Sequence, residues 1–111
     1  MKISESMIQK SIMDLLKWKA DTNLLYHFRA GSGKVRLANG KHFHTGRPGC
    51  PDIMVLFEGR YIGLEVKTKT GKQSENQNEA EADIKRCGGE YYIVRSVADV
   101  KSIFGWESVD K

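Results

Sequence analysis

Two acids and a lysine, Asp52, Glu65 and Lys67, are the residues of this sequence that could do chemistry together. Carboxylates held close to each other repel, and burying them costs several kcal/mol unless another group compensates. A divalent cation provides that compensation, since Mg²⁺ prefers carboxylate, water and phosphate oxygens. Such an ion can activate water, and a neighbouring lysine can orient that water or neutralise developing negative charge on a phosphate. The alternative is a surface ion pair of Lys67 with one of the acids, because Glu-x-Lys is a common pattern.

The stretch PDIMVLFEGRYIGLEVK, residues 51–67, predicts the β-hairpin that must position these three residues. Residues 52–57 are nearly all apolar, as expected of a strand covered on both faces. Glu58 and Gly59 form a plausible two-residue turn, with glycine supplying the positive φ that such turns need. Residues 61–67 form the returning strand.

The register of this hairpin decides whether the three polar side chains meet. With Glu58-Gly59 as the turn, Asp52 lies opposite Glu65, with Cβ atoms roughly 4.5–5.5 Å apart. Lys67 then projects from the same face. A turn shifted by one residue would pair Asp52 with Lys67 and keep all three on one face, whereas a three-residue loop would turn Asp52 away.

Length and composition limit the possible classes of protein. A chain of 111 residues, 40% hydrophobic and 29% charged, is expected to be one soluble globular domain. No apolar run approaches membrane-spanning length and no signal peptide is recognisable, so we expect a cytoplasmic protein with no membrane partner. Cys50 and Cys87 form no CxxC pair and are expected to be reduced. The net charge of +4 favours anionic partners.

The chain is predicted to open with a helix over residues 4–20. Glu5 is expected on its inward side, because it lies three residues before Ile8 in the apolar stripe. Three roles are open to it: a first-turn acid favoured by the helix dipole, a capping-box partner, or a carboxylate aimed at the site. The stripe itself consists of Ile8, Ile12, Leu15 and Leu16.

A strand over residues 24–29 and a flexible loop over residues 30–34 are predicted next. That loop resembles a fragment of a phosphate-binding P-loop, but it lacks the leading glycine spacing and has Val35 where Ser or Thr is needed. No nucleotide cofactor is therefore expected. Residues 35–38 and 41–44 predict a small hairpin around the turn Asn39-Gly40.

The segment from Thr22 to Pro51 contains no acidic residue, which indicates a surface that binds phosphodiesters. A solvated loop with accidental charge balance is the alternative. His42, His44 and Cys50 could form a zinc site, but their spacing matches no standard closed site, so exposed histidines are the simpler interpretation. The candidate nucleic-acid-binding residues are Arg29, Lys34, Arg36, Lys41, Arg47 and, after the central hairpin, Lys69.

A second helix is predicted over residues 74–87, ended by Gly88-Gly89. Ser74 and Gln77 fit a capping box, yet Gln77 also shares the sheet-facing side with Ala80 and Ile84 and could bond a site residue. A strand over residues 90–94 and a helix over residues 96–104 follow, and the tail after Gly105 is expected to be loosely held. The order is therefore αβββαβ.

These residues carry a family resemblance. Pro51-Asp52 with Glu65-Val66-Lys67 resembles the PD-(D/E)xK motif of the restriction-endonuclease-like superfamily. The wider set, Gly49 to Asp52, Ser74-x-x-Gln77 and Gly89 before Tyr91-Tyr92, resembles the virus-type replication-repair nuclease (VRR-NUC) domain. The resemblance implies an α/β fold with a restriction-endonuclease-like αβββαβ core and a mixed central sheet flanked by helices. It implies a single nuclease domain over residues 1–111, with a core at about 4–104.

The resemblance also implies roles for individual residues. Asp52 and Glu65, with Val66, would hold Mg²⁺, for which Mn²⁺ is expected to substitute, and Lys67 would position the attacking water or stabilise the transition state. Glu5 would complete the acidic centre through a water or the metal, and Gln77 would support it.

A short chain of this family resembles phage-type homodimeric resolvases of four-way (Holliday) DNA junctions, so DNA and a second copy of the chain are the expected partners. A flap- or duplex-cutting nuclease of the same fold, or a non-catalytic DNA-binding module, are the alternatives. The apolar candidates for a dimer surface are Trp18, Phe43, Tyr61 and Trp106.

Overall fold

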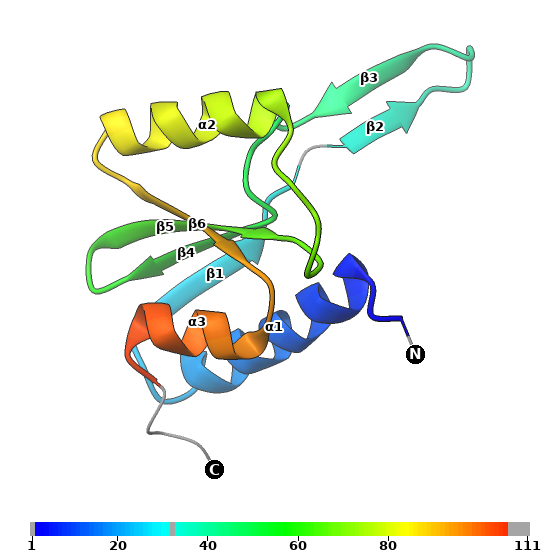
Figure 1. Ribbon diagram of the computed structural model, residues 1–111. Helices are drawn as coiled ribbons and strands as arrows, with labels where there is room; N and C mark the ends of the chain where they lie inside the picture. The colour runs from blue at the N-terminus through cyan, green and yellow to red at the C-terminus, as the bar shows by residue number, and fades with distance from the viewer. Residues whose placement is uncertain (1, 32, 107–111) are drawn as a thin grey trace.

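The computed structural model describes residues 2–31 and 33–106, except for the side chains of residues 33–35 and 43–45 (Figure 1). The chain forms, in order, α1 (Glu5–Ala20), β1 (Leu25–Arg29), β2 (Gly33–Arg36), β3 (His42–Thr45), β4 (Ile53–Phe57), β5 (Arg60–Val66), α2 (Glu75–Arg86), β6 (Glu90–Val94) and α3 (Val97–Phe104). Among the described residues, no helix is both long and apolar enough to cross a membrane. The predicted tail falls largely on residues 107–111, outside the described residues.

A mixed four-stranded sheet in the order β1-β4-β5-β6 forms the centre of the molecule. The β1–β4 and β4–β5 pairs are antiparallel, and β5–β6 is parallel. Helices α1 and α3 lie together on one side of the sheet and α2 lies on the other (Figure 1). The predicted αβββαβ core is confirmed, with the β2–β3 hairpin inserted between its first two strands.

The hairpin of β4 and β5 has the predicted two-residue turn. Glu58 and Gly59 both have positive φ, 52° and 78°, as in a type I′ turn whose twist matches the flanking strands. Phe57 pairs with Arg60 at one end and Ile53 with Leu64 at the other. Counting one step further places residue 52 opposite residue 65, which confirms the predicted register.

The core is aliphatic where α1 and α3 cover the sheet. The fully buried side chains include Ile12 and Leu16 of α1, Ile62 and Leu64 of β5, and Val100 of α3. Coverage of both faces of β4 was predicted along its whole length, and this was wrong at Leu56, which is 49% exposed. Its neighbour across the sheet, Tyr61, is also exposed, because α2 packs over β6 and leaves this part of the sheet face open.

Trp106 is not the surface residue that the sequence suggested. It is 6% exposed and stacks on Phe104, with ring centroids 4.6 Å apart, while its edge meets Phe57. Trp18 and Tyr61 are half exposed, as expected of surface candidates. The fourth candidate, Phe43, has its side chain outside the described part of the structure.

The predicted small hairpin exists, but its strands begin and end elsewhere. β2 starts at Gly33, so the second half of the predicted flexible loop is a strand. The turn is longer than expected, because the Leu37 N–H donates to the Lys41 carbonyl (2.7 Å). Within it, the Lys41 N–H donates to Asn39 Oδ1 (3.0 Å) and Gly40 has a φ of 87°. The Asn-Gly pair therefore sets the turn but not the strand limits.

Candidate active site

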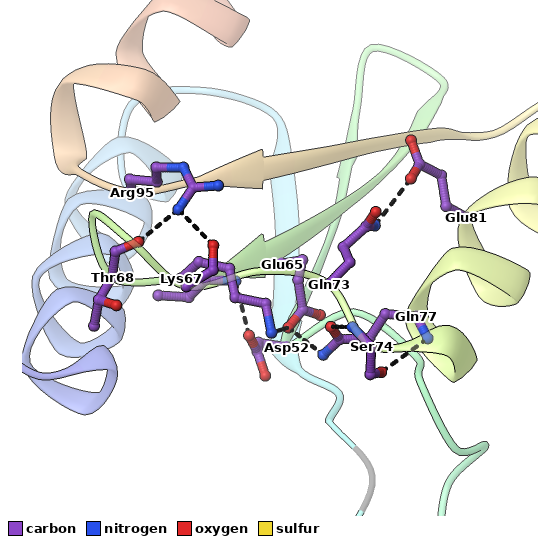
Figure 2. Close-up of polar contacts among 11 residues, drawn as sticks. Asp52, Glu65, Lys67, Thr68, Gln73, Ser74, Gln77, Glu81 and Arg95 are labelled. Carbon is purple, nitrogen blue, oxygen red and sulfur yellow. Dashed lines mark hydrogen bonds and ion pairs between the residues drawn. The ribbon is translucent and has the colours of Figure 1, made fainter.

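Four of the predicted site residues meet at the edge of the sheet where β4 begins and β5 ends. Asp52 directly precedes β4, Glu65 is the second-last residue of β5, and Lys67 follows β5. Gln77 reaches them from the first turn of α2 (Figure 2). The hairpin register brings the first three together, and the start of α2 brings the fourth.

Pro51 and Asp52 interrupt the hydrogen-bond ladder between β4 and β5. In the antiparallel pattern, residues 51 and 66 would exchange two backbone bonds. Pro51 has no N–H, so it cannot donate to the Val66 carbonyl. The Val66 N–H donates instead to Asp52 Oδ2 (2.8 Å). Because Pro51 cannot donate, the Val66 carbonyl lacks its ladder partner. The hydrogen bond from the Val66 N–H fixes the position of the Asp52 carboxylate.

Glu65 is 2% exposed, and its two oxygens have different surroundings. Its Oε2 accepts from Gln77 Nε2 (2.7 Å) and lies 3.6 Å from Lys67 Nζ. Its Oε1 is buried and has no hydrogen-bond partner among the described residues. Burial first, and then the nearby Asp52 charge, raise the pKa of Glu65 to about 8, against the opposing charge of Lys67. A buried carboxylate beside a second acid, with one oxygen that has no hydrogen-bond partner among the described residues, is an arrangement that a further positive charge would stabilise.

Gln77 performs both of the roles that its position allowed. Its Oε1 accepts from the Ser74 N–H (2.9 Å), which completes the capping box with the Gln77 N–H donating to Ser74 Oγ (3.2 Å). Because the backbone donor fixes the amide oxygen on one side, the NH₂ group must face Glu65. The cap of α2 therefore orients a hydrogen-bond donor toward the acidic centre.

The basic candidates are spread over the surface beside this site. Arg36, Lys41 and Lys69 are exposed. Arg47 forms an ion pair with Asp83 of α2. Arg29 Nε lies 2.8 Å from the Gln9 amide oxygen when that amide is oriented with its oxygen toward the arginine. The side chain of Lys34 is outside the described residues. No three His, Cys, Asp or Glu residues lie close enough to hold a metal within the described ranges, so no zinc site is found there.

Comparisons with known proteins bear on the fold. No protein-family model matches this sequence, and no curated protein matches it. Solved structures do match, among them one described as "VRR_NUC domain". It superposes with a TM-score of 0.60 over 93% of this chain and 97% of that chain, at 15% identity. The chain has the fold of a VRR-NUC domain. At this identity the likeness establishes the fold alone, so the chemistry rests on the residues.

Glu5 is the predicted site residue that the VRR-NUC fold does not bring into this cluster. It is exposed at the first position of α1, where Ser4 caps the helix by accepting from the Met7 N–H (3.2 Å). The inward placement predicted for it was wrong, because the buried stripe of α1 begins one turn later, at Ile8. A role for Glu5 through a water or a metal stays a prediction.

Arg95 is a residue of the site region that sequence reasoning missed. It follows β6, and its Nη1 donates to the carbonyls of Thr68 (2.6 Å), Gly71 (2.9 Å) and Lys69 (3.3 Å) (Figure 2). Arg95 thereby holds the loop that follows Lys67. Backbone carbonyls carry no sequence signal, so no pattern could have pointed to this contact.

The oxygen donors of the site fit a hard divalent cation. The orphaned Glu65 Oε1, the Asp52 carboxylate and the Val66 carbonyl, which a valine offers only through its backbone, gather at one strand end. Mg²⁺ is commonly held by one or two carboxylates while keeping several waters. Lys67, only 8% exposed, supplies a cation of its own next to these oxygens.

Proposed function

We propose that this protein is a metal-dependent nuclease that hydrolyses phosphodiester bonds in DNA. The observation that carries the proposal is the buried carboxylate of Glu65 beside Asp52 and Lys67, one oxygen of which has no hydrogen-bond partner in the part of the chain that the structure describes. A structural ion pair would need neither a second acid beside the buried Glu65 nor a buried carboxylate oxygen without a hydrogen-bond partner among the described residues. The VRR-NUC fold agrees with this chemistry but does not by itself establish it.

Asp52, Glu65 and the Val66 carbonyl would hold Mg²⁺ or Mn²⁺, which supplies Lewis acidity and a water of lowered pKa. Among the protein groups, Lys67 Nζ, which lies 3.6 Å from Glu65 Oε2, would orient the attacking water or neutralise charge on the phosphate. Gln77 fixes Glu65 through its 2.7 Å hydrogen bond. Glu5 would act only through a bridging water or a metal, because it lies outside the buried cluster.

The positive charge of the segment before Asp52 indicates the class of substrate. No acidic residue occurs between Thr22 and Pro51, and the exposed cations Arg36 and Lys41 stand in that segment. Lysine and arginine that neutralise phosphates supply most of the affinity of proteins for nucleic acid. We infer that DNA is the substrate, with branched DNA such as a four-way junction as the preferred form. Symmetric cutting of a junction would require a homodimer with two sites related by a two-fold axis.

The test is digestion of labelled four-way junction, flap, duplex and single-stranded DNA of one sequence, each with Mg²⁺ or with EDTA. We expect Mg²⁺-dependent cleavage, fastest on the junction, and loss of cleavage by at least about 10²-fold in Asp52→Asn. Asp14→Asn is the matched control, because Asp14 is exposed on α1 and pairs with Lys10. Junction binding without any cutting would instead identify a non-catalytic module, and equal cutting by Asp52→Asn would reject the assignment.

A further inference from the structure

The β2–β3 hairpin is a two-stranded ribbon that stands apart from the body of the molecule. Its strands pair only with each other, and neither contacts another described helix or strand. In Figure 1 it projects from the end of the molecule where α2 begins. An isolated two-stranded ribbon is at best marginally stable in water. A projecting hairpin without a supporting layer therefore indicates a surface that gains its support from a partner.

The register gives this ribbon a basic face. Position 34 pairs with 44 and position 36 with 42, so lysine, arginine and two histidines occupy positions on one face. Arg36 and His42 are exposed, as is Lys41 at the turn. No acidic residue stands anywhere in the ribbon to neutralise these charges. The charge fits a polyanion and disfavours an apolar protein partner or a second copy of the same basic surface.

Both ends of the ribbon are anchored at the candidate active site. On the β2 side, the Gly31 N–H donates to the Pro51 carbonyl (3.0 Å) and the Ala30 N–H to the Asp52 carbonyl (2.7 Å). On the β3 side, Gly49 packs so tightly on the first turn of α2 that a Cβ there would lie 2.2 Å from the Asn76 carbonyl oxygen. A ligand bound along the ribbon would therefore lie next to Asp52 and Glu65.

The dimensions of such a ribbon suit a DNA groove. Two strands about 4.8 Å apart, each of four residues and thus roughly 13 Å long, fit the major groove, which is about 12 Å wide. Phosphates line both walls of that groove, within reach of basic side chains on the ribbon.

We propose that the β2–β3 hairpin binds in the major groove of a DNA duplex and holds that duplex next to the candidate active site. The proposal takes its ligand from the nuclease function proposed above, but it concerns binding and can be tested without cleavage. The hairpin supplies the affinity for duplex arms of DNA, independently of the groups around Glu65.

The experiment measures binding of a labelled 30-base-pair duplex by fluorescence anisotropy in EDTA, over a range of salt concentrations. The hairpin variant carries Lys34→Gln, Arg36→Gln and Lys41→Gln. The control variant carries Lys10→Gln, Lys17→Gln and Lys101→Gln, which remove the same charge from α1 and α3, two helices that do not contact the hairpin strands. Circular dichroism and size-exclusion chromatography with light scattering check the fold and oligomeric state of each variant.

We expect the dissociation constant of the hairpin variant to rise at least about tenfold, and its salt slope to fall by up to about 3, one counterion per lost phosphate contact. The control variant should bind like the wild type. Equal effects of both triple variants would overturn the proposal, and so would a hairpin variant that binds DNA normally or changes only its oligomeric state. If the wild type binds through the hairpin but cuts none of the four DNA forms, the nuclease function fails and this inference stands.

Discussion

Glu65 is the residue whose environment is least compatible with a purely structural role. Its carboxylate is buried beside a second acid, and the amide of Gln77 and the ammonium of Lys67 both approach the same oxygen. The other oxygen has no protein partner among the described residues. In a metal-free protein this arrangement lowers stability, because burial disfavours the charged form.

The first prediction concerns Glu65→Gln in the absence of divalent cations. The folded pKa of Glu65, about 8, lies above its ordinary value of 4.5. The protonated form of Glu65 is therefore favoured by the folded state. The stabilisation that this provides is fully present below pH 4.5 and is lost as the pH rises through about 8. An amide does not titrate, so by pH 9 the variant should be more stable than the wild type by roughly 2–4 kcal/mol, a difference absent near pH 4. Urea unfolding in EDTA measures this, and parallel pH dependence of the two proteins would contradict it.

The second prediction separates the two roles of Gln77. Gln77→Ala removes the side-chain oxygen that accepts from the Ser74 N–H and the amide that donates to Glu65. Ser74→Ala removes only the hydroxyl that accepts from the Gln77 N–H in the cap. Each should lower the free energy of unfolding by about 1 kcal/mol. Cleavage should fall about tenfold further in Gln77→Ala, since a lost hydrogen bond to a charged group is worth about 1.5 kcal/mol or more. Matched rates in the two variants would show that Gln77 acts only as a cap.

The sequence predicted the polar residues of the site better than it predicted the residues that hold them in position. Asp52, Glu65 and Lys67 could be placed together because strand pairing has a fixed period and Glu58-Gly59 is a plausible two-residue turn. Gln77 could be assigned two roles but not both at once. Glu5 was misplaced because the first residue of a helix need not follow its apolar stripe. Arg95 could not be found, since its partners are backbone carbonyls.

At the scale of elements, Gly49 determines how closely α2 approaches the site. Its φ is 84°, and a Cβ would lie 2.2 Å from the Asn76 carbonyl oxygen and 2.8 Å from the Gln77 nitrogen. Only glycine allows the segment before Pro51 to pass this close to the helix. The glycine that the sequence showed as part of a motif is thus a packing requirement of α2.

The third prediction compares Gly49→Ala with Gly40→Ala. Both glycines have φ near 85°, but a Cβ at Gly40 meets nothing within 4 Å. Gly40→Ala should therefore show only the backbone strain, about 1 kcal/mol. Gly49→Ala should lower the free energy of unfolding by a further 1–3 kcal/mol, roughly the effect of overpacking, and slow cleavage by shifting Gln77. Thermal unfolding of the two variants measures the difference, and similar melting temperatures would show that α2 moves without penalty.

At the scale of the whole molecule, the closing segment completes the core. Trp106 covers Phe57 and Phe104, and Lys19 Nζ lies 5.0 Å from the centre of its ring. The sequence could not place it, because it follows the last periodic segment and belongs to no predicted helix or strand. The element order and the central hairpin were predictable, since each rests on local periodicity and turn signals. The mixed sheet was implied by the family resemblance and not by these local signals. The packing of segments distant in sequence over the sheet, such as the segment with Trp106, was not predictable.

The fourth prediction compares Trp106→Ala with Trp18→Ala. Trp106 is 6% exposed and Trp18 is 48% exposed. Removing the buried ring should lower the free energy of unfolding by about 3–5 kcal/mol, whereas removing the exposed ring should lower it by less than about 1 kcal/mol. Chemical denaturation measures both. Unchanged stability of Trp106→Ala would contradict the placement of this residue in the core.

Calorimetric titration of the metal-free protein with Mn²⁺ tests whether Asp52 and Glu65 together hold a divalent cation, as we propose. Wild type, Asp52→Asn, Glu65→Gln and the surface control Asp14→Asn are titrated under identical conditions, with folding checked beforehand. We expect Mn²⁺ to bind the wild type and the control with similar affinity, and to bind each of the other two variants at least about tenfold more weakly. Unchanged Mn²⁺ affinity in both Asp52→Asn and Glu65→Gln, or none in the folded wild type, would contradict it.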